Sequence, residues 1–131
     1  MKLSKKLKLD IFKNALCNGL GEFSGYGLEL YYSDNDYDRA KEYLKKNSTE
    51  QICYEDVLVA ILEIGGALQI FDYEGDSEII SCVKLEDMLD NMDLACEKQT
   101  EHCLDMINEQ DDAVTADVIL QMVFFKDVIF G

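Results

Sequence analysis

Apolar residues recur at helical spacing near the start of the chain, with lysines filling the positions between them. Leu7 and Ile11 lie one turn apart on the apolar face of a helix that begins near Ser4. We expect Gly19 and Gly21 to end this helix, because glycine is the residue most often found just after a helix.

The next segment changes to a strand pattern and then returns to a helical one. Residues 25–32 alternate and are rich in aromatic side chains, which indicates a strand. Ser33 followed by Asp36 resembles a capping box at a helix N-terminus. We expect that helix to end at Asn47, where a run of short polar residues begins.

The middle of the chain predicts a core helix followed by a β-hairpin. Residues 54–64 are apolar on two faces, so we expect this helix to be central to the core. Two glycines end it. Residues 67–73 and 77–83 then read as two strands, and the short loop between them contains Gly75, which is a good hairpin signal.

The C-terminal third predicts three further helices. A short one covers residues 85–92, and a longer one, capped by Asp93, covers residues 93–108. We expect Thr115 to cap the last helix, which runs to about Phe125. The apolar residues 128–130 should dock, either as an edge strand or against the core.

These elements predict one α+β domain over residues 1–131. It should contain about five to six helices packed around a β-hairpin at about 67–83, with a third strand near 26–32. A chain of this length matches a single domain, and its apolar content of 48% is sufficient for a core.

Charge changes this picture, because the chain carries a net charge of −15 that is unevenly distributed. Residues 1–13 contain five lysines and one acid. From residue 47 onward only three lysines oppose 20 acids. Such a body repels nucleic acids and anionic membranes, so we expect neither as a direct partner. It should associate with basic protein surfaces, including those of nucleic-acid-binding proteins. The N-terminal lysines should pair partly with the acidic body.

The five cysteines are odd in number and no membrane-spanning or signal segment is apparent. Free and mostly buried thiols in a reducing compartment are the simplest interpretation. We therefore expect a cytoplasmic protein.

Six acids form the candidate acidic contact surface, four around the hairpin turn and two in the loop before the last helix. They are Asp72, Glu74, Asp76, Glu78, Asp111 and Asp112. The hairpin acids alternate, so they are also candidates for binding a hard cation, or for a solvated edge that blocks aggregation. We favour the solvated edge over a cation site.

Two other clusters contain side chains that can bind metal ions, but neither has the residue spacing of a known metal site. Asp34 and Asp36 alternate as in a calcium loop, but the glycine and glutamate that such a loop requires are missing, so we expect them to cap a helix. Cys96, His102 and Cys103 lack the paired spacing of a zinc site. We expect no metal, no cofactor and no catalytic residues.

Three classes of function remain open. The favoured one is a small acidic protein-binding module that occupies a basic surface of a partner, as inhibitors, immunity proteins and DNA mimics of mobile elements do. The first alternative is a structural or oligomeric accessory protein with no ligand, in which the apolar tail at residues 124–130 packs against a second copy, for example in a homodimer. The second alternative is an enzyme that depends on a divalent metal.

Overall fold

The computed structural model describes residues 2–131 and confirms the α+β prediction, with six helices and a three-stranded antiparallel sheet. No helix in this part of the chain is long and apolar enough to cross a membrane. The elements in chain order are α1 (Lys5–Gly25), β1 (Leu28–Tyr31), α2 (Asp34–Asn47), α3 (Tyr54–Glu63), β2 (Leu68–Asp72), β3 (Glu78–Val83), α4 (Leu85–Lys98), α5 (Thr100–Ile107) and α6 (Ala113–Phe125).

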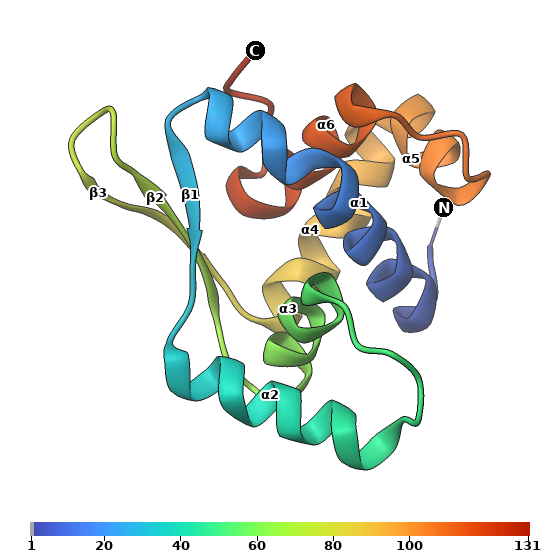
Figure 1. Ribbon diagram of the computed structural model, residues 1–131. Helices are drawn as coiled ribbons and strands as arrows, with labels where there is room; N and C mark the ends of the chain where they lie inside the picture. Colours follow the sequence, from blue (N-terminus) through green and yellow to red (C-terminus); the bar gives the residue numbers. More distant parts are fainter. Residues whose placement is uncertain (1) are drawn as a thin grey trace.

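The sheet has the order β1-β2-β3, so the predicted third strand pairs with the hairpin (Figure 1). Leu30 lies opposite Ile70, and Leu68 lies opposite Val83. These side chains face the helices, and both β2 residues are fully buried. A register shift between Ile70 and Phe71 marks a bulge in the hairpin. The helices lie on one side of the sheet, and the end of the hairpin extends beyond them.

The prediction that α1 ends at Gly19 or Gly21 is wrong, because the helix continues to Gly25. Gly19 is buried where α1 crosses α6. A Cβ atom at this position would lie 2.8 Å from Cδ1 of Leu120 and 3.0 Å from the backbone carbonyl carbon of Ala116. Gly19 therefore serves the close approach of two helices, which outweighs its low helix propensity.

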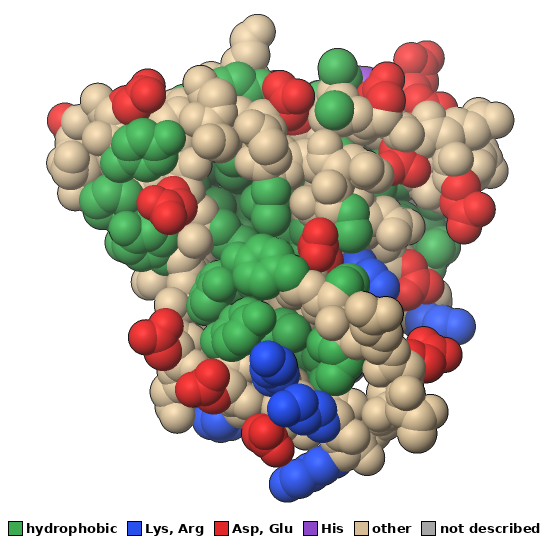
Figure 2. All heavy atoms as spheres, viewed as in Figure 1, with side chains coloured by type: hydrophobic (Ala, Val, Ile, Leu, Met, Phe, Trp, Pro, Cys, Tyr) green, Lys and Arg blue, Asp and Glu red, His purple; other side chains and the backbone are tan. Residues whose placement is uncertain are grey.

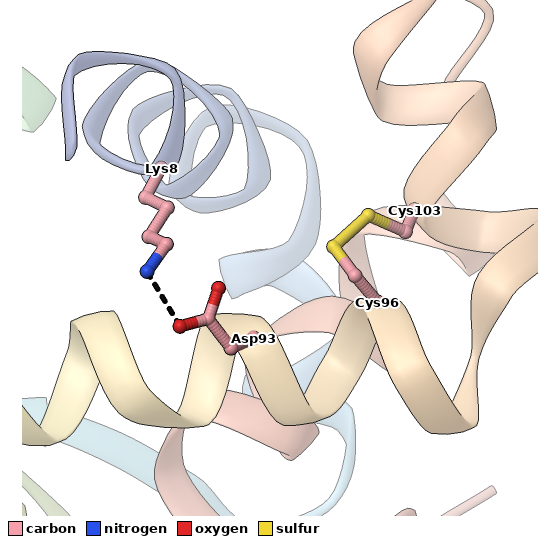
Figure 3. A network of polar contacts seen from close by, with 4 residues as sticks. All are labelled: Lys8, Asp93, Cys96 and Cys103. Atoms are coloured by element: carbon pink, nitrogen blue, oxygen red, sulfur yellow. Dashed lines mark hydrogen bonds and ion pairs between the residues drawn. A yellow bond between two sulfur atoms is a disulfide. The ribbon is translucent and has the colours of Figure 1, made fainter. Parts of the chain in front are cut away.

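The predicted boundary at Asp93 is also wrong. α4 runs without interruption to Lys98. The helical conformation is interrupted at Gln99, and α5 begins at the next residue. Asp93 lies in the middle of α4, where its Oδ2 accepts a hydrogen bond of 2.6 Å from Nζ of Lys8 (Figure 3). The hydroxyl of Thr100 donates to the carbonyl of Cys96, which satisfies one backbone group that the break leaves open.

Two of the cysteines form a disulfide, which corrects the prediction of free and mostly buried thiols. Cys96 and Cys103 are seven residues apart and their Cα atoms are 5.1 Å apart. On an unbroken helix this separation would be about 10 Å, so the break at Gln99 makes the bond possible. The other three cysteines are free and exposed. Disulfides are typical of oxidising compartments, so the cytoplasmic location stays a prediction without this support.

The C-terminal tail docks against the core and does not form an edge strand. This confirms one of the two predicted arrangements. Gln121 is fully buried in α6, and its Oε1 accepts hydrogen bonds from the backbone N–H groups of Ile129 (2.8 Å) and Phe130 (2.9 Å). Its Nε2 donates to the carbonyl of Phe130 at 3.2 Å. The Phe130 ring stacks on Tyr26 with the centroids 5.3 Å apart. The Gln121 amide thus forms the hydrogen bonds with the tail backbone that a neighbouring β-strand would otherwise form.

Replacing Gly19 with alanine should lower the free energy of unfolding by about 1–2 kcal/mol, because the added methyl group meets the backbone of Ala116. Gly21→Ala is the matched control. Nothing lies within 4 Å of a Cβ there, so this change should stabilise the helix by about 0.5–1 kcal/mol. Urea unfolding measures both. Equal effects of the two substitutions would show that the α1–α6 crossing does not require Gly19.

Alkylation of the folded protein without reductant should modify three thiols, those of Cys17, Cys53 and Cys82. After reduction and unfolding, all five cysteines should react. Intact-mass spectrometry counts the adducts, and peptide mapping should recover Cys96 linked to Cys103. Five adducts on the protein purified without reductant would contradict the disulfide.

Candidate functional site

The candidate site is the end of the β2–β3 hairpin, which carries four of the six predicted acids. Asp72 closes β2 and lies opposite Glu78, the first residue of β3. Oδ1 of Asp72 accepts a hydrogen bond of 2.7 Å from the N–H of Gly75, which shapes the turn. Glu74 packs against Gly27, the residue before β1. Asp76 lies at the exposed tip.

None of the four hairpin carboxylates pairs with a cation in the described part of the chain. The four ion pairs found there involve residues outside the hairpin, and two of them confirm that the N-terminal lysines pair with the acidic body. The pairs are Lys8–Asp93, Lys13–Asp56, Arg39–Asp36 and Lys45–Glu42. None of these pairs therefore neutralises the negative charge of the hairpin.

The other two predicted acids lie away from the hairpin. Asp111 and Asp112 belong to the loop between α5 and α6, on the opposite side of the molecule in Figure 1. The predicted cap at Thr115 is wrong: Asp112 caps α6, because its Oδ1 accepts a 2.9 Å hydrogen bond from the N–H of Thr115. This bond lowers the pKa of the Asp112 carboxyl. Asp111 accepts a hydrogen bond from Asn18 at 2.9 Å. The structure thus divides the six acids into two separate sets.

An apolar strip lies on the uncovered face of the sheet, next to the hairpin end along the strands. The rings of Tyr31 and Phe71 stack with their centroids 5.1 Å apart and only 8° between their planes. Ile79 lies opposite Phe71 on the next strand. Tyr31 and Ile79 are each 41% exposed. Exposed apolar side chains rimmed by charge are typical of protein contact surfaces.

The sequence carried only part of the signal for this strip. The alternation of Leu28–Tyr31 assigns Tyr31 to the face opposite the leucines. Its stack with Phe71 depends on the pairing of β1 with β2, which are far apart in the chain. That pairing gave no local signal.

The other clusters have structural explanations. Ser33 accepts a hydrogen bond from the N–H of Asp36, which confirms the capping role of this segment. Cys96 and Cys103 are joined to each other, and Nδ1 of His102 lies 3.0 Å from Oγ1 of Thr115. Among residues 2–131, no three His, Cys, Asp or Glu side chains lie close enough to hold a metal ion.

Comparisons of the chain with models of protein families, with curated proteins and with solved structures gave no match. The function is therefore inferred from the geometry of the hairpin and its charge.

Replacing Asp112 with alanine should lower the melting temperature near neutral pH. Because the folded-state pKa of Asp112 lies below its unfolded value, the stabilisation is present above the unfolded pKa of about 3.9 and is lost as the pH falls through the folded value. The difference from the unmodified protein should thus shrink in acid. Thermal unfolding by circular dichroism measures it, with Asp111→Ala as the control. A difference independent of pH would contradict the role of the ionised cap.

Proposed function

We propose that this protein is a small acidic binding module that docks its β2–β3 hairpin on a basic surface of another protein. The observation that carries the proposal is the exposed end of the hairpin, where four carboxylates without a cation partner among the described residues follow the Tyr31–Phe71–Ile79 strip along the strands.

The two parts of this surface would contribute differently to binding. The apolar strip supplies area that is removed from water in the complex, which is the main source of affinity. The carboxylates lie beyond one end of the strip, where they would form part of the rim of the interface. Rim charges speed the encounter with a partner of opposite charge and disfavour wrong partners.

The basic surface of a nucleic-acid-binding protein fits this hairpin best. Such a surface binds phosphates, and carboxylates on a protruding hairpin present the same sign of charge. Occupation of that surface would exclude the nucleic acid, which is how an inhibitor or DNA mimic acts. We propose no catalytic activity and no cofactor for this role.

The oligomeric alternative has less support, because the tail that suggested it is largely packed on its own chain. Phe124 is buried, and Phe130 stacks on Tyr26. Two bodies of net charge −15 would also repel each other on contact.

The double substitution Asp76→Asn and Glu78→Gln tests the proposal, because both side chains are exposed and no hydrogen bond to either side chain occurs among the described residues. A partner captured from lysate of the source cells at low salt should bind the variant about fivefold to tenfold more weakly, since each exposed charge contributes up to about 1 kcal/mol. Affinity for the identified partner, measured by titration calorimetry over a series of salt concentrations, gives the result.

The matched control is Glu97→Gln with Glu101→Gln, which removes the same charge from exposed positions on α4 and α5. It should leave affinity within about twofold. If both double variants weaken binding equally, only the total charge matters and the hairpin is not the contact. Affinity that does not change with salt would overturn the electrostatic basis of the proposal.

A further inference from the structure

A groove runs beside β1 and reaches the hairpin end at Tyr73. It lies between the free edge of the strand and the C-terminal half of α1, and its volume is about 480 Å³. Leu20 and Phe23 line it from α1, and Leu28 and Leu30 line it from β1. Figure 2 shows hydrophobic side chains gathered on the surface between α1, β1 and α2. The volume is within the range of about 300–1,000 Å³ that ligand sites occupy.

The edge of β1 that faces this groove has unpaired backbone groups. β1 is an edge strand and pairs only with β2. The N–H of Tyr73 donates to the carbonyl of Gly27 at 3.1 Å, and the backbone direction alternates from there along the strand. The groups of Leu28 and Leu30 therefore point away from β2. In residues 2–131, no other element donates to or accepts from them. Leu28 is almost fully buried, so Leu30 is the accessible point.

Two tyrosines close the ends of the groove, and each is held in place. Tyr73 donates from its hydroxyl to the carbonyl of Ser24 in the last turn of α1, at 3.3 Å. The hydroxyl of Tyr54 lies 2.9 Å from that of Tyr32, and burial together with this contact raises the pKa of Tyr54. Tyr54 and Tyr73 are 43% and 44% exposed. Fixed aromatic rings bind a ligand with little loss of conformational entropy.

The charge around the groove is negative. Glu29 is the charged residue of the lining, and it forms no ion pair among the described residues. Glu74 lies near the Tyr73 end, against Gly27. A second copy of this chain would bring another net charge of −15, so charge favours a basic occupant.

The opposite edge of the sheet is less suited to the same use. The pairing of β3 with β2 contains the register shift at Ile70 and Phe71. Bulges of this kind are a common way in which proteins prevent strands from adding to an edge. No register shift interrupts the pairing of β1 with β2.

We propose that the groove binds an extended segment of a basic partner protein, which adds to β1 as a fourth strand. Alternate apolar side chains of the segment would enter the groove between Leu20 and Tyr54, and its Lys or Arg side chains would lie beside Glu29. Main-chain hydrogen bonds to Leu30 give affinity, and the groove gives specificity. The inference rests on the proposed function for the basic character of the partner, but it assigns a separate contact.

The probe is the synthetic peptide Lys-Val-Lys-Ile-Lys-Val with blocked ends and a fluorescent label, titrated near 0.15 M salt by anisotropy. It should bind the unmodified protein and shift the backbone amide resonance of Leu30. Ser24→Trp should weaken binding about tenfold or more, because the ring fills the groove from an exposed position. Methylating alternate peptide nitrogens should weaken it about as much, because strand pairing then fails.

Thr49→Trp places the same ring at an exposed site on the α2–α3 loop and should leave binding within about twofold. Thermal unfolding verifies that both tryptophan variants fold. Glu29→Gln should weaken binding, and a peptide with Glu in place of Lys should bind at least about tenfold more weakly.

The proposal is overturned if the unmodified protein does not bind the lysine peptide. Binding that tolerates Ser24→Trp or nitrogen methylation would overturn it too, because the peptide would then lie elsewhere or bind without strand pairing. Asp76→Asn with Glu78→Gln should keep peptide binding within about twofold. Weaker partner capture by that variant with retained peptide binding separates the hairpin contact from the groove. Unchanged partner capture would contradict the hairpin contact, and loss of peptide binding would contradict the groove.

Discussion

The crossing of α1 and α6 is the contact on which the rest of the molecule depends. Because Gly19 has no Cβ atom, the two helices approach closely. A Cβ at this position would lie 2.8 Å from the Leu120 side chain and 3.0 Å from the Ala116 backbone. The rings of Phe12 and Phe23 then meet Phe124, with centroids 6.2 and 6.1 Å apart. Because β1 leaves directly from the end of α1, this crossing also fixes the position of the sheet edge and of the groove beside it.

The ion pairs of the N-terminal lysines do not involve the hairpin acids. Lys8 and Lys13 join α1 to acids of α4 and α3, at 2.6 Å in both pairs (Figure 3 shows the first). These contacts use the basic N-terminal segment to neutralise part of the acidic body. The hairpin acids receive no such partner, and on the face seen in Figure 2 lysine and arginine gather mainly over α2. The hairpin therefore keeps its charge in the folded protein.

Two buried polar side chains of α6 hold the residue that follows α1 and the C-terminal tail in place. Asp117 and Gln121 lie on α6 and are linked by a hydrogen bond of 3.1 Å. Asp117 accepts from the Tyr26 hydroxyl at 2.6 Å, which raises the pKa of Tyr26 to about 12. Gln121 binds the tail through Phe130. A buried network of this kind is stable only when each member has a partner. Through Tyr26 and Phe130, this network connects α6 to the end of α1 and to the C-terminal tail.

The sequence by itself determined the features that depend on neighbouring residues. Ser4 and Ser33 accept the N-cap bonds that their positions predict, and the hairpin lies where Gly75 and the flanking strand patterns indicated. Only the tertiary structure decided the continuation of α1 through Gly19 and the break that lets Cys96 reach Cys103.

The tertiary structure also decided which acids share a surface. Asp112 has the same chemistry as the hairpin acids, but it caps α6 on the other side of the molecule. The pairing of β1 with β2 and the groove between β1 and α1 bring together residues far apart in the chain. Local patterns record hydrogen bonds and burial within one element, whereas the distance between elements depends on how their side chains pack.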